Sequence, residues 1–149
     1  MPRWPGFLFR EFAGLRDGVL ELRLSSVVAE WPAYLFEIHP IGAEASVGRI
    51  SIRFDDDPSI ALYAGNIAYE IDPGHRGHGH AARACRLLRL VARHHGVDEL
   101  WIVTAPENVA SRRTAEAIGA EFIDTLAMPP DTDMYAQGVR QARRYRWRP

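Results

Sequence analysis

The sequence has a single cysteine, Cys85, so no disulfide can form within its 149 residues. One thiol is typical of proteins from a reducing compartment. No apolar run approaches the roughly 20 residues that cross a bilayer. The first residues, Met1 to Pro5, lack the apolar stretch of a secretory signal. A net charge of −1 provides no general attraction for nucleic acid or an acidic membrane. These absences predict a soluble, cytoplasmic protein.

The remaining composition is that of an ordinary globular protein, with 47% hydrophobic and 25% charged residues. No internal repeat, low-complexity tract or long linker divides the chain. We therefore expect residues 1–149 to form a single domain with its own hydrophobic core.

The apolar residues repeat first with the spacing of strands and then mainly with the spacing of helices. Alternating apolar and polar residues predict half-buried strands at 19–24, 34–39, 47–54 and 66–71. Helical spacing then predicts helices at 79–95 and 109–118, with strands at 100–103, 121–123 and 143–147. This order predicts an α/β fold with a mixed, mostly antiparallel central sheet flanked by helices.

The most informative segment is the glycine-bearing turn from Arg76 to Ala81, between a predicted strand and the first predicted helix. Such a turn leaves backbone N–H groups free at a helix N-terminus. Free donors and the positive end of the helix dipole both favour an anion. We therefore expect the turn to hold the phosphates of a cofactor.

Two familiar phosphate-binding loops do not fit this turn. A Walker loop needs Lys followed by Ser or Thr, whereas His80 and Ala81 stand here. A dinucleotide fingerprint needs three glycines after a parallel strand, and only Gly77 and Gly79 are present.

The segment Arg76-Gly77-His78-Gly79-His80-Ala81 resembles the signature of the GNAT superfamily of N-acetyltransferases. That signature is Arg or Gln, two residues, Gly, one residue, then Gly or Ala. A second similarity follows at Asn108-Val109-Ala110-Ser111, which opens a predicted helix that ends at Gly119 before an aromatic strand. The resemblance extends from Val19 to the C-terminus. It implies a GNAT fold and an acetyl-CoA-dependent N-acetyltransferase.

The resemblance also implies where acetyl-CoA binds. The turn residues Arg76, Gly77, His78, Gly79, His80 and Ala81 should hold the pyrophosphate. The backbone of Tyr69 and Ile71 should pair with the pantetheine arm as an added strand. Asn108 should bond the pantetheine or the adjacent backbone, and Ser111 should lie near the thiol.

Direct acetyl transfer in a ternary complex needs an oxyanion donor, a base and an acid. We expect the N–H of Ile71 to hold the thioester oxygen, and Glu70 to act as the base if it faces the acceptor. Many family members carry a tyrosine as the acid where this chain has Ala115. Ser111 is the nearest substitute in the sequence.

The sequence does not specify the acceptor, which we expect to be a primary amine of a small molecule or a protein N-terminus. Its cleft should involve residues 25–34, 55–65 and 127–138, with acidic side chains attracting a cationic amine. A homodimer through the C-terminal strand is also possible in this family.

Other interpretations remain open. The missing tyrosine is compatible with a non-catalytic module that binds acyl-CoA as a sensor or scaffold. The arginine-rich tail would suit a nucleic-acid binder, although the net charge argues against that partner. His75, His78 and His80 have the spacing to share a metal ion, but no dependable third ligand pattern accompanies them, so we expect no metal.

Overall fold

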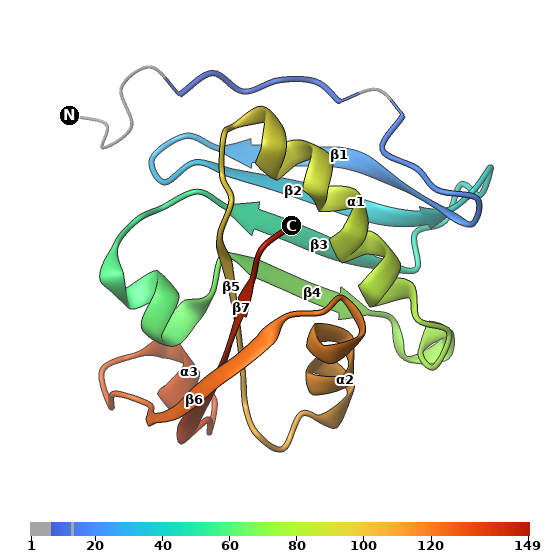
Figure 1. Ribbon diagram of the computed structural model, residues 1–149. Helices are drawn as coiled ribbons and strands as arrows, with labels where there is room; N and C mark the ends of the chain where they lie inside the picture. The colour runs from blue at the N-terminus through green and yellow to red at the C-terminus, as the bar shows by residue number, and fades with distance from the viewer. Residues whose placement is uncertain (1–6, 13) are drawn as a thin grey trace.

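The computed structural model describes residues 7–12 and 14–149, so the Met1–Pro5 stretch lies outside the described residues. The described chain forms two β-sheets and three α-helices (Figure 1). The first sheet has four strands in chain order: β1 (Leu20–Val28), β2 (Ala33–Pro40), β3 (Gly48–Arg53) and β4 (Ile67–Ile71). The second sheet has the order β5-β7-β6, from β5 (Leu100–Thr104), β6 (Glu121–Ala127) and β7 (Gln141–Trp147).

All strand pairs within the two sheets are antiparallel, and the expected central sheet is divided between β4 and β5. The order of the strands and of the two longer helices follows the sequence pattern, whereas the short helix α3 (Asp133–Ala136) lies in a stretch that was expected to be a loop. Two strands are longer than predicted. The strand expected at 19–24 is β1, which ends at Val28, and the strand expected at 121–123 is β6, which ends at Ala127. Residues 25–27 are exposed and therefore show no alternation of buried and exposed side chains that would predict a strand. Their pairing with β2 is what extends β1.

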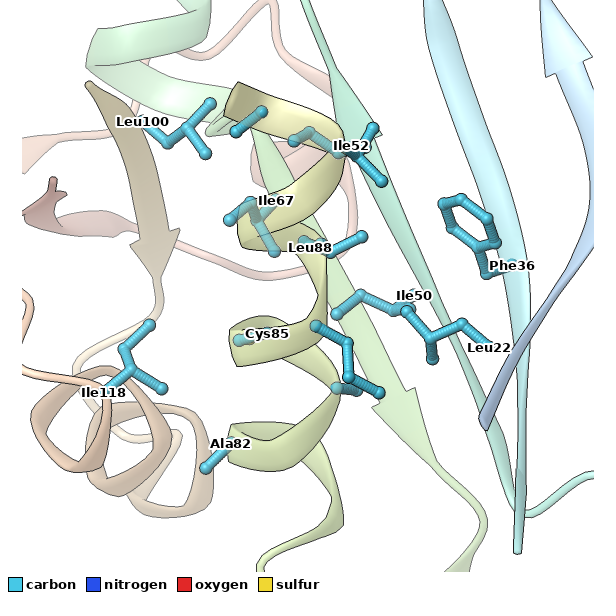
Figure 2. Close-up of a cluster of buried hydrophobic side chains, with 14 of the residues drawn as sticks. Leu22, Phe36, Ile50, Ile52, Ile67, Ala82, Cys85, Leu88, Leu100 and Ile118 are labelled. Atoms are coloured by element: carbon cyan, nitrogen blue, oxygen red, sulfur yellow. The ribbon is translucent and has the colours of Figure 1, made fainter. Parts of the chain in front are cut away.

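Helix α1 (His80–His94) lies across one face of the first sheet and closes the main core (Figure 1). Its buried side is directed at apolar side chains of the strands, as Figure 2 shows for Cys85 and Leu88 opposite Ile50 and Ile67. Burial raises the pKa of the Cys85 thiol to about 12. Cys85 is therefore a core residue and not a nucleophile at neutral pH. No helix of the described chain is both long and apolar enough to span a membrane.

Asn66 joins the two sheets at the point where β4 and β5 separate. Its backbone N–H donates to the Trp101 carbonyl at 2.7 Å, and its Oδ1 accepts from the Trp101 N–H at 2.8 Å. Its Nδ2 donates to the Arg53 carbonyl at 3.0 Å, so the side chain replaces a backbone donor of the β3–β4 ladder. The preceding Gly65 has φ +79°, and a Cβ there would stand 3.1 Å from the Val103 nitrogen. Two sequential residues thus hold the sheets together at one end and let them diverge at the other.

The edge of β4 that faces away from β3 is not paired with another strand of the described chain. The Asn66 carbonyl accepts from Arg53, and the Asp72 N–H donates to Val47. These two bonds show which residues of β4 direct their backbone groups at β3, because hydrogen-bonded and non-hydrogen-bonded pairs alternate along antiparallel strands. Tyr69 and Ile71 therefore direct their backbone groups away from β3, toward an edge that no strand occupies.

The N-terminal segment packs over the C-terminal end of α1 through His95. Phe7 stacks on the His95 ring with centroids 4.4 Å apart, and Tyr34 Oη lies 2.7 Å from His95 Nε2. Burial, with a smaller effect from His94, holds the pKa of His95 below its ordinary value of 6.5.

Protonating His95 therefore favours the unfolded chain, in which its pKa is ordinary. The stability from this group is complete above pH 6.5 and is lost as the pH falls through the lower folded-state pKa. We expect the urea concentration at the midpoint of unfolding to fall between pH 7.5 and pH 5.5 by more in the wild type than in His95→Gln. Equal differences would show that His95 does not contribute to the acid sensitivity.

Candidate active site

A groove of 560 Å³ lies where β4 separates from the second sheet, between β4, the start of α1 and helix α2 (Val109–Ala117). It collects most residues that the sequence predicted for the cofactor. Its lining consists of Tyr69, Glu70, Ile71, His75, Arg76, Gly77, Gly79, His80, Ala81, Ala82, Asn108, Ala110, Ser111, Arg113, Thr114 and Ala117. Of the predicted cofactor residues, His78 alone is not part of this lining. Arg113 adds a positive charge that the sequence motifs did not include.

The turn from Arg76 to Ala81 needs its two glycines for backbone conformation. Gly77 has φ +85° and Gly79, the N-cap of α1, has φ +73°, a region that L side chains rarely adopt. A Cβ at either residue would meet no atom within 4 Å, so the backbone is openly accessible there. The turn therefore presents uncovered peptide groups at the N-terminus of a 15-residue helix.

Two side chains of this turn have distinct surroundings. Arg76 Nε donates to the Ile71 carbonyl at 2.8 Å, so the guanidinium bends back toward the end of β4. His80 Nδ1 is buried without a hydrogen-bond partner among the described residues. Burial, followed by the effects of His78, His75 and Arg83, lowers the pKa of His80. An unpaired buried nitrogen beside open peptide groups is a position that a ligand would satisfy.

The first turn of α2 forms the opposite wall of the groove. Asn108 is its N-cap, and its Oδ1 accepts from the Ser111 N–H at 3.1 Å. Ser111 Oγ lies 2.9 Å from the hydroxyl of Tyr69, whose Oη also donates to the Ser111 carbonyl at 3.1 Å. The sequence assigned only a backbone role to Tyr69. Alternation along β4 predicts that the Tyr69 side chain points opposite to that of Glu70, and the structure shows that this is the face covered by α1.

Glu70 faces the other side of β4. Its carboxylate pairs with Arg49 Nη2 at 2.7 Å, and both side chains are more than half exposed. A second hollow, of 690 Å³, covers this face and is also lined by Glu37, Ser51 and Asp72. Tyr69 and Glu70 border both hollows, so the two spaces flank the same part of β4. Glu70 thus faces a hollow that is distinct from the groove, and its role as a base stays a prediction.

Ala115 is fully buried in the core, at 0% exposure, on the side of α2 away from the groove. The groove-lining side of the helix carries Ser111 and Thr114 instead. A tyrosine at position 115 would point into the packed core here, so this helix cannot present the acid of many relatives from that position.

The histidines of the turn do not assemble a metal centre among residues 7–12 and 14–149, where no group of three or more His, Cys, Asp or Glu could hold an ion. The rings of His78 and His80 lie 5.6 Å apart between centroids.

A family model described as an acetyltransferase (GNAT) domain matches residues 19–121. The match covers more than half of the sequence, and the chain belongs to the GNAT acetyltransferase family. A comparison with curated proteins gave no match.

Solved acetyltransferases share the fold over 78% of this chain. One is a ribosomal-protein-S5-alanine acetyltransferase from Vibrio fischeri, with 15% identity, a TM-score of 0.63 and 61% of its own length covered. Another, from Salmonella typhimurium, modifies the N-terminal serine of a 50S ribosomal subunit protein (16% identity, TM-score 0.59, 64% covered). A third is the microcin C7 self immunity acetyltransferase MccE, in complex with acetyl-CoA and AMP (18% identity, TM-score 0.60, 61% of its own length covered). This chain therefore spans less than two thirds of their length, and the likeness confirms the GNAT fold.

Proposed function

We propose that the chain transfers an acetyl group from acetyl-CoA directly to a primary amine, with both substrates bound at once. The observation that carries this proposal is the pair of hollows that flank β4 at Tyr69 and Glu70. One hollow has the features of a cofactor groove, and the other is open to a second substrate. Solved relatives with the same fold include a complex with acetyl-CoA and enzymes that act on ribosomal proteins.

The cofactor groove suits coenzyme A along its whole length. The open peptide groups at Gly77 and Gly79 would bind the diphosphate, assisted by the dipole of α1 and the unpaired nitrogen of His80. The outward backbone groups of Tyr69 would bond the amide groups of the pantetheine arm, and the Ile71 carbonyl would do so once Arg76 Nε releases it. Acetyl-CoA would supply an acyl carbon activated as a thioester.

The second hollow suits a cationic amine. Glu37, Glu70 and Asp72 contribute three carboxylates to its lining, whereas Arg49 contributes one positive charge. Local attraction would raise the concentration of an ammonium substrate near β4. The acidic character thus comes from the open face of the first sheet, and not only from the loops that the sequence indicated. The acceptor class we propose is a small-molecule amine or a protein N-terminus.

During transfer the amine nitrogen bonds to the acetyl carbon, and the carbon–sulfur bond breaks. Glu70 would accept a proton from the amine after its ion pair with Arg49 opens. Ser111 would hydrogen-bond the leaving sulfur, where the positive end of the α2 dipole also stabilises negative charge. Holding both substrates in place supplies much of the rate. The assignment of the thioester oxygen to the Ile71 N–H remains a prediction.

The proposal is tested by calorimetry with CoA and by release of its thiol against a panel of amines and short peptides. Buried Cys85 gives little background with a thiol reagent, because burial raises its pKa to about 12. All 18 basic Lys and Arg positions are arginine, so the enzyme carries no lysine amine that could be acetylated. CoA binding with no turnover on any amine would favour the sensor interpretation instead.

Glu70→Gln and Ser111→Ala are expected to lower kcat on the best amine by roughly 10- to 100-fold, because each removes a proton-transfer or hydrogen-bonding group. The dissociation constant for CoA should remain within about twofold, since neither side chain belongs to the phosphate turn. Steady-state kinetics and calorimetry on both variants measure these values. Near-normal turnover in both would reject the assigned pair.

A further inference from the structure

The hydroxyls of Tyr69 and Ser111 form a pair that connects β4 to α2 across the cofactor groove. Their oxygens lie 2.9 Å apart, and Tyr69 Oη lies 3.1 Å from the Ser111 carbonyl oxygen. Both residues line the groove, so the pair stands at its inner wall. The N-cap bond from Asn108 Oδ1 fixes the Ser111 backbone, which holds the serine side of the pair in position.

This pair has two possible hydrogen arrangements. Each hydroxyl has one hydrogen to donate. When Tyr69 donates to the Ser111 carbonyl, Ser111 Oγ–H can donate back to Tyr69 and its hydrogen is held away from the groove. When Tyr69 donates to Ser111 Oγ, the serine hydrogen is released toward the groove. A sulfur anion that arrives beside Ser111 would favour the second arrangement.

We propose that Tyr69 is a positioning residue that directs the Ser111 hydroxyl at the leaving sulfur of acetyl-CoA. This inference rests on the proposed transfer reaction. As the carbon–sulfur bond breaks, its electron pair moves to sulfur, and Ser111 Oγ–H donates a hydrogen bond to that sulfur. Tyr69 keeps its own proton throughout and donates to Ser111 Oγ. The proton that finally neutralises the thiolate comes from solvent, to which Glu70 passes the proton that it accepted from the amine.

The surroundings of Tyr69 suit a permanent donor. Burial, the largest effect, raises the pKa of Tyr69 well above its ordinary value of 10. Its hydroxyl is therefore protonated at neutral pH and can donate a hydrogen bond. Because Ala115 faces the core, the part of α2 that lines the groove presents no tyrosine. The strand tyrosine supplies the phenol from the opposite wall.

The test compares Tyr69→Phe, Ser111→Ala and the double variant with the wild type. Tyr69→Phe should lower kcat about tenfold, the rate equivalent of one hydrogen bond. The dissociation constant for CoA and the KM for acetyl-CoA should stay within about twofold. The double variant should be no slower than Ser111→Ala, because residues that act as a unit are not additive. Ser111→Thr, which keeps the hydroxyl, should recover most of the activity.

Tyr34→Phe is the matched control, because it removes a phenol that bonds His95 at the opposite end of α1. It should leave kcat unchanged even if it lowers the melting temperature. An unchanged kcat in Tyr69→Phe, or a double variant that multiplies the two single losses, would overturn the positioning role. Wild-type protein that binds CoA but acetylates no amine would instead overturn the proposed function, and this inference with it.

Discussion

Gly79→Val is expected to weaken CoA binding by at least about tenfold. A non-glycine residue at the φ of +73° found here costs roughly 1–2 kcal/mol, and each 1.4 kcal/mol is about tenfold in affinity. A β-branched residue is disfavoured further in that conformation. The turn must then either distort, which misdirects its N–H groups, or retain the strain. Isothermal calorimetry with CoA measures the loss.

Gly96→Val is the control for that experiment. Gly96 follows the other end of the same helix, has φ +68°, and a Cβ there would meet no atom within 4 Å. Both variants should lose similar stability in urea, whereas only Gly79→Val should lose affinity for CoA. Equal affinity in the two variants would mean that the turn does not bind the diphosphate.

Asn66→Leu is expected to lower the free energy of unfolding by about 2–3 kcal/mol. The replacement has a similar volume but leaves the Trp101 N–H and the Arg53 carbonyl without their side-chain partners. An unsatisfied, partly buried group costs about 1–3 kcal/mol. Urea unfolding followed by tryptophan fluorescence measures the change.

Gln137→Leu makes the same amide-to-apolar change at an exposed position after α3 (Asp133–Ala136). It should alter stability by no more than about 0.5 kcal/mol. If Asn66→Leu behaves like this control, the amide of Asn66 does not hold the two sheets together. If it behaves as expected, CoA affinity should fall as well, because the groove opens where those sheets diverge.

The lining of the groove that we propose for CoA was largely predictable because its residues belong to motifs that are local in sequence. Gly77 and Gly79 are required by a turn of few residues, and Asn108 caps the helix that begins at the next residue. Such features depend on backbone conformation within one turn. The family match over residues 19–121 confirms the assignment that these motifs supported.

The hydroxyl pair of Tyr69 and Ser111 could not be predicted in this way. Its members are 42 residues apart, and their distance depends on how far β4 diverges from β5 and where α2 packs. The place of Ala115 could not be predicted either. From the sequence, it indicated only that the tyrosine acid of many family members is missing. Its burial shows that this part of α2 belongs to the core.

By itself, the sequence determined the alternating and helical segments, the glycine turn and the family, because each depends on neighbouring residues or a short motif. Tertiary structure decided that the strands separate into two sheets at Asn66. It also decided that Glu70 and Tyr69, which strand alternation already places on opposite faces, border two different hollows. Finally, it decided that the hydroxyls of Tyr69 and Ser111 lie within hydrogen-bond distance of each other. These outcomes depend on hydrogen bonds and packing between distant segments, which only the folded chain brings within a few ångströms of each other.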